Sequence, residues 1–202
     1  MNEAKILLLY KGTFMVKDKL IICDLDGTLF DTRRVNYMAY KEAIIKLGLP
    51  MNTSYDEYIK KCWGPTYRAF LPIMGVAPEY FEEVHDLKKT LYVKNLKYAT
   101  ENTHLFNMLE ALKSTYYTAV VTSGSKNSKD ILRHFGRYDL FDVIFTIDDV
   151  KYGKPDPEGF FKAMEYFKVK PQDTMIFEDS DVGLCAARKT GASVCVVDDF
   201  KK

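Results

Sequence analysis

Five short, nearly continuous apolar runs recur along the chain and predict strands that are buried on both faces. They cover residues 19–24, 117–122, 143–146, 175–178 and 193–197. Such runs are typical of a parallel sheet that is covered by helices on both sides. Between the last four runs, apolar residues at helical spacing predict helices over residues 129–135, 157–167 and 182–190. Strands and helices that alternate in this way form right-handed βαβ units, so an α/β fold with a parallel sheet is expected.

The stretch after the first strand has a different pattern and predicts an inserted helical domain. Residues 33–101 are rich in Tyr, Lys and Glu and contain no good strand candidate. Helical spacing predicts helices there over residues 35–47, 55–62, 67–71 and 78–98, and a further helix of the sheet domain over residues 103–113. We therefore expect an α/β core of residues 1–32 and 99–202, interrupted by a helical cap of residues 33–98.

The composition is that of an ordinary globular protein. The 202 residues are 47% hydrophobic and 28% charged, which excludes a disordered or fibrous chain. Lys and Arg number 29 against 28 Asp and Glu, so the net charge of +1 gives no reason to expect nucleic acid as a partner. No apolar run approaches the roughly 18–20 residues of a membrane span, so no membrane partner is expected either.

The first residues and the cysteines bear on where the protein works. The start of the chain lacks the basic region, long apolar stretch and small-residue cleavage site of a secretory signal. The four cysteines form no C-x-x-C pair and are expected to be buried, reduced thiols, so we expect a cytoplasmic protein. The role of residues 1–18 stays open, because residues 6–10 could add an edge strand and Met15 could be the true first residue.

Polar residues gather where the predicted strands end. Asp24 and Asp26 follow the first strand, and two carboxylates at positions i and i+2 could form a turn, a metal clip or a catalytic pair. In parallel α/β sheets, ligands bind beyond the carboxyl ends of the strands. The same edge is expected to receive the polar residues that end other strands or precede a helix: Thr122, Ser123, Lys154, Glu178 and Asp179. Together they supply an anionic nucleophile, hydroxyl and amide donors, one cation and an acidic pair.

These motifs, in this order, resemble those of the haloacid dehalogenase superfamily. They read DLDGT at residues 24–28, TSG at 122–124, GKPD around Lys154 and FEDS at 177–180. The chain is most similar to the branch of phosphatases with a helical cap, which includes phosphoglycolate phosphatase and β-phosphoglucomutase. The resemblance covers residues 19–198 and implies a Rossmann-like α/β core with an inserted helical cap.

The resemblance implies a role for each catalytic residue. Asp24 is the expected nucleophile and forms an aspartyl phosphate, which splits a difficult reaction into two easier steps. Asp26 is expected to protonate the leaving alkoxide and then to activate water. Lys154 is expected to pair with Asp24 and the phosphate as a compact point charge. Thr122 is expected to donate its hydroxyl to a phosphoryl oxygen, with Ser123 as the alternative.

Mg²⁺ is the expected cofactor. A carboxylate that attacks a phosphate dianion is repelled by it, and Mg²⁺ prefers oxygen ligands and binds phosphate oxygens. By the resemblance, its ligands are Asp24, the backbone carbonyl of Asp26, and Asp179, with Glu178 beside it directly or through water.

Recognition of the organic part of the substrate is expected to fall to the cap, because the core contacts only the phosphate. Gly64 and Pro65 break the helical spacing of residues 62–68 and signal a turn. Trp63 and Arg68 are therefore candidates to contact the substrate, and an ordinary turn with a packed Trp is the alternative. The lysines of residues 88–94 are expected on the solvent-exposed face of the long cap helix.

The predicted function is Mg²⁺-dependent hydrolysis of a small phosphomonoester, a sugar phosphate or a phosphoglycolate-like metabolite, by a monomer or weak dimer. The alternatives are a phosphomutase of the β-phosphoglucomutase type and a non-catalytic phosphate-binding regulator, against which the intact acid pair and Lys154 argue. In such mutases a hinge histidine follows the first motif, where this chain has Asn36. Asparagine does not titrate near neutral pH as histidine does, so hydrolysis is favoured.

Overall fold

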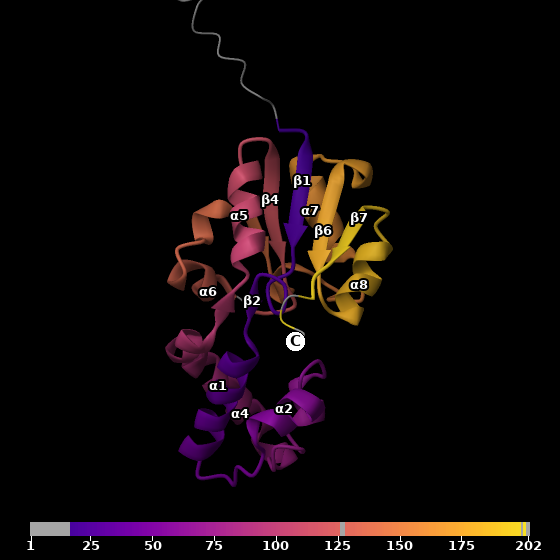
Figure 1. Ribbon diagram of the computed structural model, residues 1–202. Helices are drawn as coiled ribbons and strands as arrows, with labels where there is room; N and C mark the ends of the chain where they lie inside the picture. The colour runs from indigo at the N-terminus through magenta and orange to yellow at the C-terminus, as the bar shows by residue number, and fades with distance from the viewer. Residues whose placement is uncertain (1–16, 126–127, 199, 201–202) are drawn as a thin grey trace, which may run out of the picture.

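A five-stranded parallel sheet forms the centre of the larger domain in the computed structural model, which describes residues 17–125, 128–198 and 200 (Figure 1). The strands are β1 (Lys19–Cys23), β4 (Tyr116–Val121), β5 (Val143–Phe145), β6 (Thr174–Glu178) and β7 (Ser193–Val196). They lie in the order β5-β4-β1-β6-β7, and every pairing is parallel. The predicted α/β class and all five predicted strands are confirmed.

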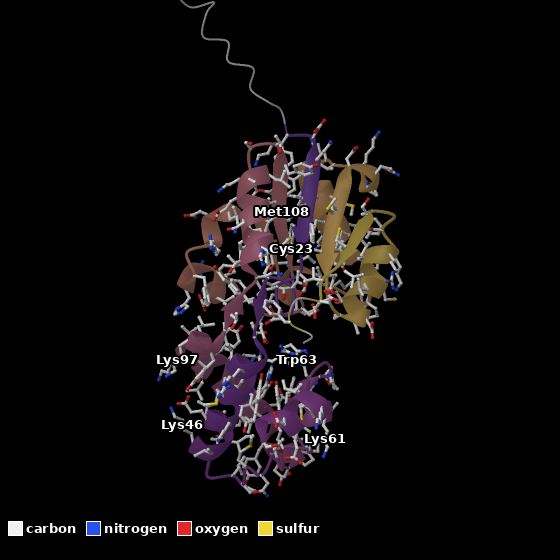
Figure 2. The ribbon with its side chains drawn as sticks, viewed as in Figure 1. Cys23, Lys46, Lys61, Trp63, Lys97 and Met108 are labelled. Atoms are coloured by element: carbon white, nitrogen blue, oxygen red, sulfur yellow. The ribbon has the colours of Figure 1, made fainter. Side chains whose placement is uncertain are left out.

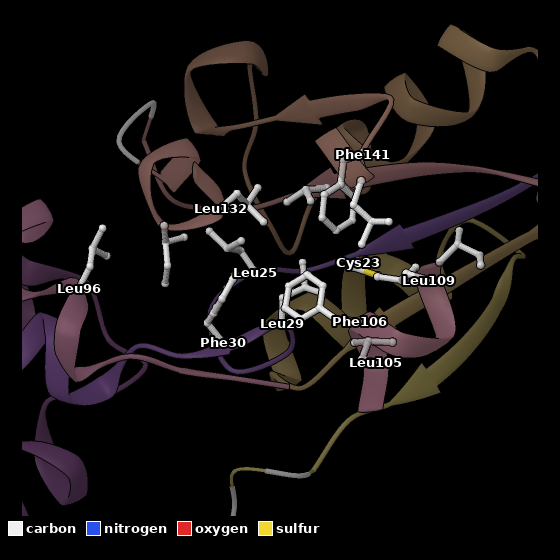
Figure 3. Close-up of a cluster of buried hydrophobic side chains, with 14 of the residues drawn as sticks. Cys23, Leu25, Leu29, Phe30, Leu96, Leu105, Phe106, Leu109, Leu132 and Phe141 are labelled. Carbon is white, nitrogen blue, oxygen red and sulfur yellow. The ribbon is translucent and has the colours of Figure 1, made fainter. Parts of the chain in front are cut away.

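The central strand β1 shows why its sequence is continuously apolar. Ile21 and Cys23 belong to a hydrophobic cluster on one face of the sheet, whereas Leu20 and Ile22 belong to a cluster on the other face. Successive side chains of a strand point to opposite faces, so a strand covered on both sides needs an apolar residue at every position. Figure 3 shows Cys23 close to Leu109, within the first of these clusters.

Two helices cover each face of the sheet. α5 (Thr103–Leu112) and α6 (Ser128–His134) contribute to the cluster that contains Ile21. α7 (Glu158–Phe167) and α8 (Asp181–Arg188) contribute to the cluster that contains Leu20. These helices agree with the predicted ones to within a few residues at each end. Three-layer packing of this kind leaves the carboxyl ends of the strands accessible, between the loops.

The smaller domain is helical and has its own apolar cluster. Its helices are α1 (Arg33–Lys46), α2 (Tyr55–Lys61), α3 (Tyr67–Phe70) and α4 (Phe81–Tyr92). Ile44, Tyr58 and Met74 are among the fully buried members of the cluster. Ser54 begins α2 with a capping box, in which its hydroxyl accepts from the Glu57 amide and the Glu57 carboxylate accepts from the Ser54 amide.

The prediction of one helix over residues 78–98 is wrong. The segment contains a 3₁₀ turn at Pro78–Tyr80, then α4, then a 3₁₀ helix at Val93–Tyr98. Such tight turns are common at the ends of α-helices. Leu96, in the second 3₁₀ helix, belongs to the same hydrophobic cluster as Leu132, and Figure 3 labels both residues. The cap is therefore packed against the core at this end, and the predicted domain boundaries at residues 33 and 98 stay a prediction.

A short antiparallel ribbon joins the two domains. It pairs β2 (Phe30–Asp31) with β3 (Thr100–Glu101), so the expectation of no strand in residues 33–101 is wrong. Two residues are too few to show the alternation by which a strand is recognised in a sequence. In Figure 1, β2 lies at the junction between the sheet and α1.

Each strand of the ribbon carries a carboxylate that an arginine binds. Arg137 donates from Nε and Nη2 to the two Glu101 oxygens at 3.0 and 2.9 Å, and it also binds Glu110. Arg33 donates from Nε and Nη2 to Asp31 at 2.8 and 2.6 Å, and its Nη2 also donates to the Phe200 carbonyl at 2.6 Å. Bidentate pairs fix orientation as well as distance. The connection between core and cap is thus held from both strands.

The other expectations concern membrane-spanning helices, the cysteines and the first residues of the chain. No helix in the described part of the chain is long and apolar enough to cross a membrane. All four cysteines are free, and Cys23 and Cys62 are buried as expected. Cys195 is only partly buried, and Cys185 is exposed because it lies on the solvent side of α8, so for these two the expectation of burial is wrong. The possible strand at residues 6–10 and the possible start at Met15 lie outside the described residues.

Candidate active site

The motif residues lie together at the carboxyl end of the sheet. Asp24 directly follows β1, Thr122 directly follows β4, and Glu178 is the last residue of β6. The sheet hydrogen bonding continues one residue beyond the first two strands. The Asp24 amide donates to the Phe177 carbonyl at 2.9 Å, and the Thr122 amide donates to the Phe145 carbonyl at 3.0 Å. These bonds fix the backbone beneath both side chains.

Lys154 connects two of the predicted acidic residues. Its Nζ lies 2.5 Å from Asp24 Oδ1 and 2.8 Å from Glu178 Oε1. The side chains are 7%, 8% and 1% exposed for Lys154, Asp24 and Glu178, so the three charges are almost out of water. Buried charges are tolerated when they are paired and hydrogen-bonded, and Glu178 also accepts from the amide and hydroxyl of Ser180.

Burial and charge act on the pKa values of this trio in opposite directions. Burial raises the pKa of Asp24 well above its usual range, Lys154 opposes this rise, and Glu178 adds to it. Burial alone would lower the pKa of Lys154, but its two carboxylate partners raise it on balance. Lys154 is therefore a fixed cation beside Asp24.

Three carboxylates form a cluster with the chemistry of a divalent-cation site. Asp24, Glu178 and Asp179 each offer an oxygen, and these oxygens lie within 4.8 Å of one another. Two glycines leave them space: a Cβ on Gly27 would lie 2.2 Å from Asp179 Oδ2, and one on Gly183 would lie 1.9 Å from Glu178 Oε1. An all-oxygen, partly buried donor set of this kind fits a hard cation such as Mg²⁺.

Asp26 stands apart from this cluster and is held by the ribbon that leads to the cap. The Thr32 hydroxyl donates to Asp26 Oδ1, and Thr32 itself is fully buried at the start of α1. Burial raises the pKa of Asp26, while the hydrogen bond from Thr32 and the charges of Lys88 and Lys154 oppose the rise. A carboxyl group with a raised pKa is suited to carry a proton to a leaving group.

The loop after β4 offers the predicted hydroxyl groups. Thr122 is buried, and its Oγ1 accepts from the Gly124 amide at 3.0 Å, whereas Ser123 is exposed. A Cβ on Gly124 would lie 2.1 Å from Ser128 Oγ, so glycine permits the tight turn here. Which of the two hydroxyls would contact a phosphate stays a prediction.

A pocket of about 100 Å³ lies between the two domains, beside Asp26. Its other core residues are Gly124, Ser125 and Ser128, and its cap residues are Asn36, Lys88, Lys89 and Tyr92. The pocket joins segments that are far apart in the sequence, and its cap side is cationic. A molecule that binds beside Asp26 in this pocket would lie next to the positively charged Lys88 and Lys89 of α4.

Lys88 is a site residue that the sequence analysis missed. The expectation that the lysines of residues 88–94 all lie on the solvent-exposed face is wrong for Lys89 and also for Lys88, which, like Lys89, is partly buried and lines the pocket. Its Nζ lies 5.2 Å from the ring centroid of Tyr40 and 4.8 Å from that of Tyr92. Lys88 lies four residues from the buried Val84 and four from the buried Tyr92, so it shares their helix face. This spacing is the sequence signal that could have placed Lys88 on the buried face of the helix.

The order of the motifs and the arrangement of the sheet agree with a known family. The sequence model of the haloacid dehalogenase-like hydrolases matches residues 21–197. The chain belongs to this family. The family, the fold class and an enzyme of this kind, all predicted from the motifs, are therefore confirmed.

Individual members of the family differ in their named activities. A phosphorylated carbohydrates phosphatase from Thermotoga maritima is 32% identical over 181 residues, which are 85% of this chain and 81% of that protein. A β-phosphoglucomutase from Bacillus subtilis is 26% identical over 182 residues, covering 86% and 80%. The crystal structure of CbbY from Rhodobacter sphaeroides in complex with phosphate has a TM-score of 0.78 and 25% identity, covering 90% and 87%. Haloacid dehalogenase-like relatives of this chain thus include both phosphatases and a mutase.

The two cap residues predicted to contact the substrate have different surroundings. Arg68 is exposed and pairs with Glu82, with Nη2 at 2.8 Å from Oε1. Trp63 packs, partly buried, against the cap cluster, and Figure 2 shows it at the end of the cap nearest the core. Neither residue is among the described residues that line the pocket beside Asp26. Their role in substrate binding stays a prediction.

Proposed function

We propose that this haloacid dehalogenase-like chain hydrolyses a small phosphomonoester, a sugar phosphate or a phosphoglycolate-like metabolite, through an aspartyl phosphate on Asp24. The observation that carries the proposal is the position of Lys154, 2.5 Å from Asp24 and 2.8 Å from Glu178 at the carboxyl end of the sheet. The proposed partner is thus a small phosphate ester. A cytoplasmic location and a monomer or weak dimer are parts of the same proposal.

Mg²⁺ is the proposed cofactor. The residues that would hold it are Asp24, Glu178 and Asp179, together with the backbone carbonyl of Asp26. The support is the set of carboxylate oxygens within 4.8 Å of one another. When bound, the cation would neutralise charge on the transferring phosphoryl group.

In the first step, a carboxylate oxygen of Asp24 attacks the phosphorus and the bond to the leaving oxygen breaks. Asp26 gives its proton to that oxygen, a role that its raised pKa supports. Lys154 holds Asp24 in place and offsets negative charge as the phosphoryl group approaches. The products of this step are the free alcohol and the phosphorylated Asp24.

In the second step, Asp26 acts as a base, because it lost its proton in the first step. It takes a proton from water and the water oxygen attacks the phosphorus. The bond between phosphorus and the Asp24 oxygen breaks, which frees inorganic phosphate and restores the Asp24 carboxylate. The Thr32 hydroxyl orients Asp26 in both steps through its hydrogen bond. The hydroxyl of Thr122, or that of Ser123, and the amides of the same loop would donate to the phosphoryl oxygens.

A phosphomutase is the second candidate, because a β-phosphoglucomutase is among the relatives. In that reaction the phosphate on Asp24 would return to a sugar hydroxyl instead of passing to water. Asn36 argues against it: it lines the pocket, donates to the Thr32 carbonyl at 3.0 Å and does not titrate near neutral pH. A non-catalytic regulator is disfavoured by the complete set of Asp24, Asp26 and Lys154.

The test supplies a sugar 1-phosphate with a catalytic amount of the bisphosphate, in the presence of Mg²⁺, and follows both products. We expect inorganic phosphate to appear faster than isomerised sugar phosphate. Isomerised sugar phosphate that forms faster than inorganic phosphate would contradict the phosphatase and favour the mutase.

A further inference from the structure

The pocket contains one cation, Lys88, that forms no ion pair with a described residue, although the charge of Asp26 in the same pocket acts on it. None of the residues 17–125, 128–198 and 200 forms a hydrogen bond or ion pair with Lys88, and its Nζ lies over the rings of Tyr40 and Tyr92. Its neighbour Lys89 differs, because its Nζ lies 3.0 Å from Asp86 Oδ1. Burial lowers the pKa of Lys88 to about 8, in spite of the charge of Asp26.

Lys88 lies on the side of the site where the organic part of a substrate would bind. The phosphoryl group belongs at Asp24, where Lys154 already supplies a cation. Asp26 is the residue that protonates the leaving oxygen, so the organic part lies on its side of the site. Asp26 and Lys88 line the same pocket, and they are close enough for Lys88 to lower the pKa of Asp26.

A partly buried ammonium group without a hydrogen-bond or ion-pair partner costs free energy, because it has lost part of its hydration. The rings of Tyr40 and Tyr92 offset only a fraction of that cost. An anionic group on the substrate would supply the missing partner as it enters the pocket. A neutral hydroxyl could accept a hydrogen bond from the ammonium group, but it would bring no opposite charge to offset the lost hydration.

We propose, on the basis of the function proposed above, that Lys88 binds a second anionic group on the organic part of the substrate. The substrate class is then a compact phosphomonoester that carries a carboxylate or a second phosphate, and not a neutral sugar monophosphate. Lys88 is the specificity-determining residue, and Lys89, on the same pocket wall, adds positive charge.

The first experiment compares matched esters with the wild-type protein and Mg²⁺. One pair is 2-phosphoglycolate and 2-hydroxyethyl phosphate, which differ by a carboxylate. The other is glucose 1,6-bisphosphate and glucose 6-phosphate, which differ by a phosphate. We expect kcat/KM to favour the anionic member of at least one pair by about 10- to 100-fold, the range of a hydrogen bond to a charged group. The favoured pair identifies the anion.

The second experiment uses Lys88→Met, which removes the charge and keeps an apolar side chain of similar length. The preference should fall to near unity, mainly because KM rises more for the anionic ester than for the neutral one. Lys88→Arg should restore the preference. Lys94→Met is the matched control, because Lys94 is exposed in the following 3₁₀ helix, outside the pocket, and its substitution should change nothing.

Three outcomes would overturn the proposal: no preference in the wild type, a preference that survives Lys88→Met, or an equal loss of kcat for both esters in Lys88→Met. The last would mean that Lys88 acts on the reacting group. If Lys88→Met does not fold, as judged by its thermal melt, Lys88→Gln takes its place, and the wild-type comparison stands regardless. Absence of phosphate release from every ester would contradict the proposed function itself.

Discussion

At the scale of single residues, the carboxylate cluster depends on glycines whose Cβ positions are already occupied, and Gly183 is the clearest case. Gly183 lies in the first turn of α8, and a Cβ there would come within 1.9 Å of Glu178 Oε1 and 2.1 Å of its Cδ. Glu178 cannot simply move away, because its carboxylate binds Lys154 and Ser180. Position 183 thus needs glycine because the Glu178 carboxylate occupies the space of a Cβ, and not because the helix backbone there needs glycine's conformational freedom.

Gly183→Ala separates this explanation from helix propensity. Propensity alone predicts a gain of about 1 kcal/mol in the free energy of unfolding, since Ala replaces Gly within a helix. We expect instead a loss of about 1–2 kcal/mol from overpacking, with a fall in phosphate release as the bond between Lys154 and Glu178 is disturbed. Urea unfolding measures the first and a phosphate assay the second.

Val182→Ala is the control for that experiment, because Val182 is an exposed neighbour in the same helix. It should change the free energy of unfolding by less than about 0.5 kcal/mol and leave the activity unchanged. A Gly183→Ala variant that is more stable than the wild type and fully active would show that Glu178 is not confined by Gly183.

At the scale of elements, the ribbon of β2 and β3 determines how the cap meets the core. Two residues from each strand form it, so its own hydrogen bonds are few. Phe30 is fully buried in the core cluster, and Arg137 on Glu101 and Arg33 on Asp31 add to the anchoring. Thr32 follows β2 directly and donates to Asp26. The connection to the cap and the proposed general acid are therefore held by one short segment.

Arg137→Met tests the anchoring of the ribbon. The variant loses two hydrogen bonds to Glu101, which are partly shielded from water, and an exposed one to Glu110. We expect the free energy of unfolding to fall by about 1 kcal/mol. Arg133→Met is the matched control, since Arg133 is more exposed and pairs only with the nearby Asp130 among the described residues. Equal effects of the two substitutions in urea unfolding would argue that the ribbon gains nothing from Arg137.

Strands and ribbon show why sequence predicts some elements and not others. β1 was predictable because burial on both faces leaves a continuous apolar run, whereas β2 and β3 are too short to carry any pattern. The break of residues 78–98 into α4 and two 3₁₀ segments was missed because all three keep nearly the same helical spacing. Their boundaries follow from packing of Leu96 against the core, a contact that local sequence does not contain.

At the scale of the whole molecule, the candidate site is assembled from both domains. The core part was predictable, since Asp24 and Glu178 stand in motifs at strand ends, which the topology of a parallel sheet brings together, and Lys154 stands in a motif before a helix. The cap part was not. Lys88 reaches the pocket only because α4 packs across α1 and against the core, so its role depends on the orientation of a helix that periodicity alone leaves open.

The central claim is that Asp24 is the nucleophile of a Mg²⁺-dependent phosphatase, and the most direct measurement is phosphate release by Asp24→Asn. The amide fits the same space but cannot attack, so we expect a loss of about 10³-fold or more with an unchanged thermal melt. Asp173→Asn is the matched control, because Asp173 is exposed and lies outside the site. It should keep wild-type activity, and excess chelator should abolish the activity of both the wild type and Asp173→Asn. Release by purified Asp24→Asn above a trace, or full wild-type activity in chelator, would contradict the account.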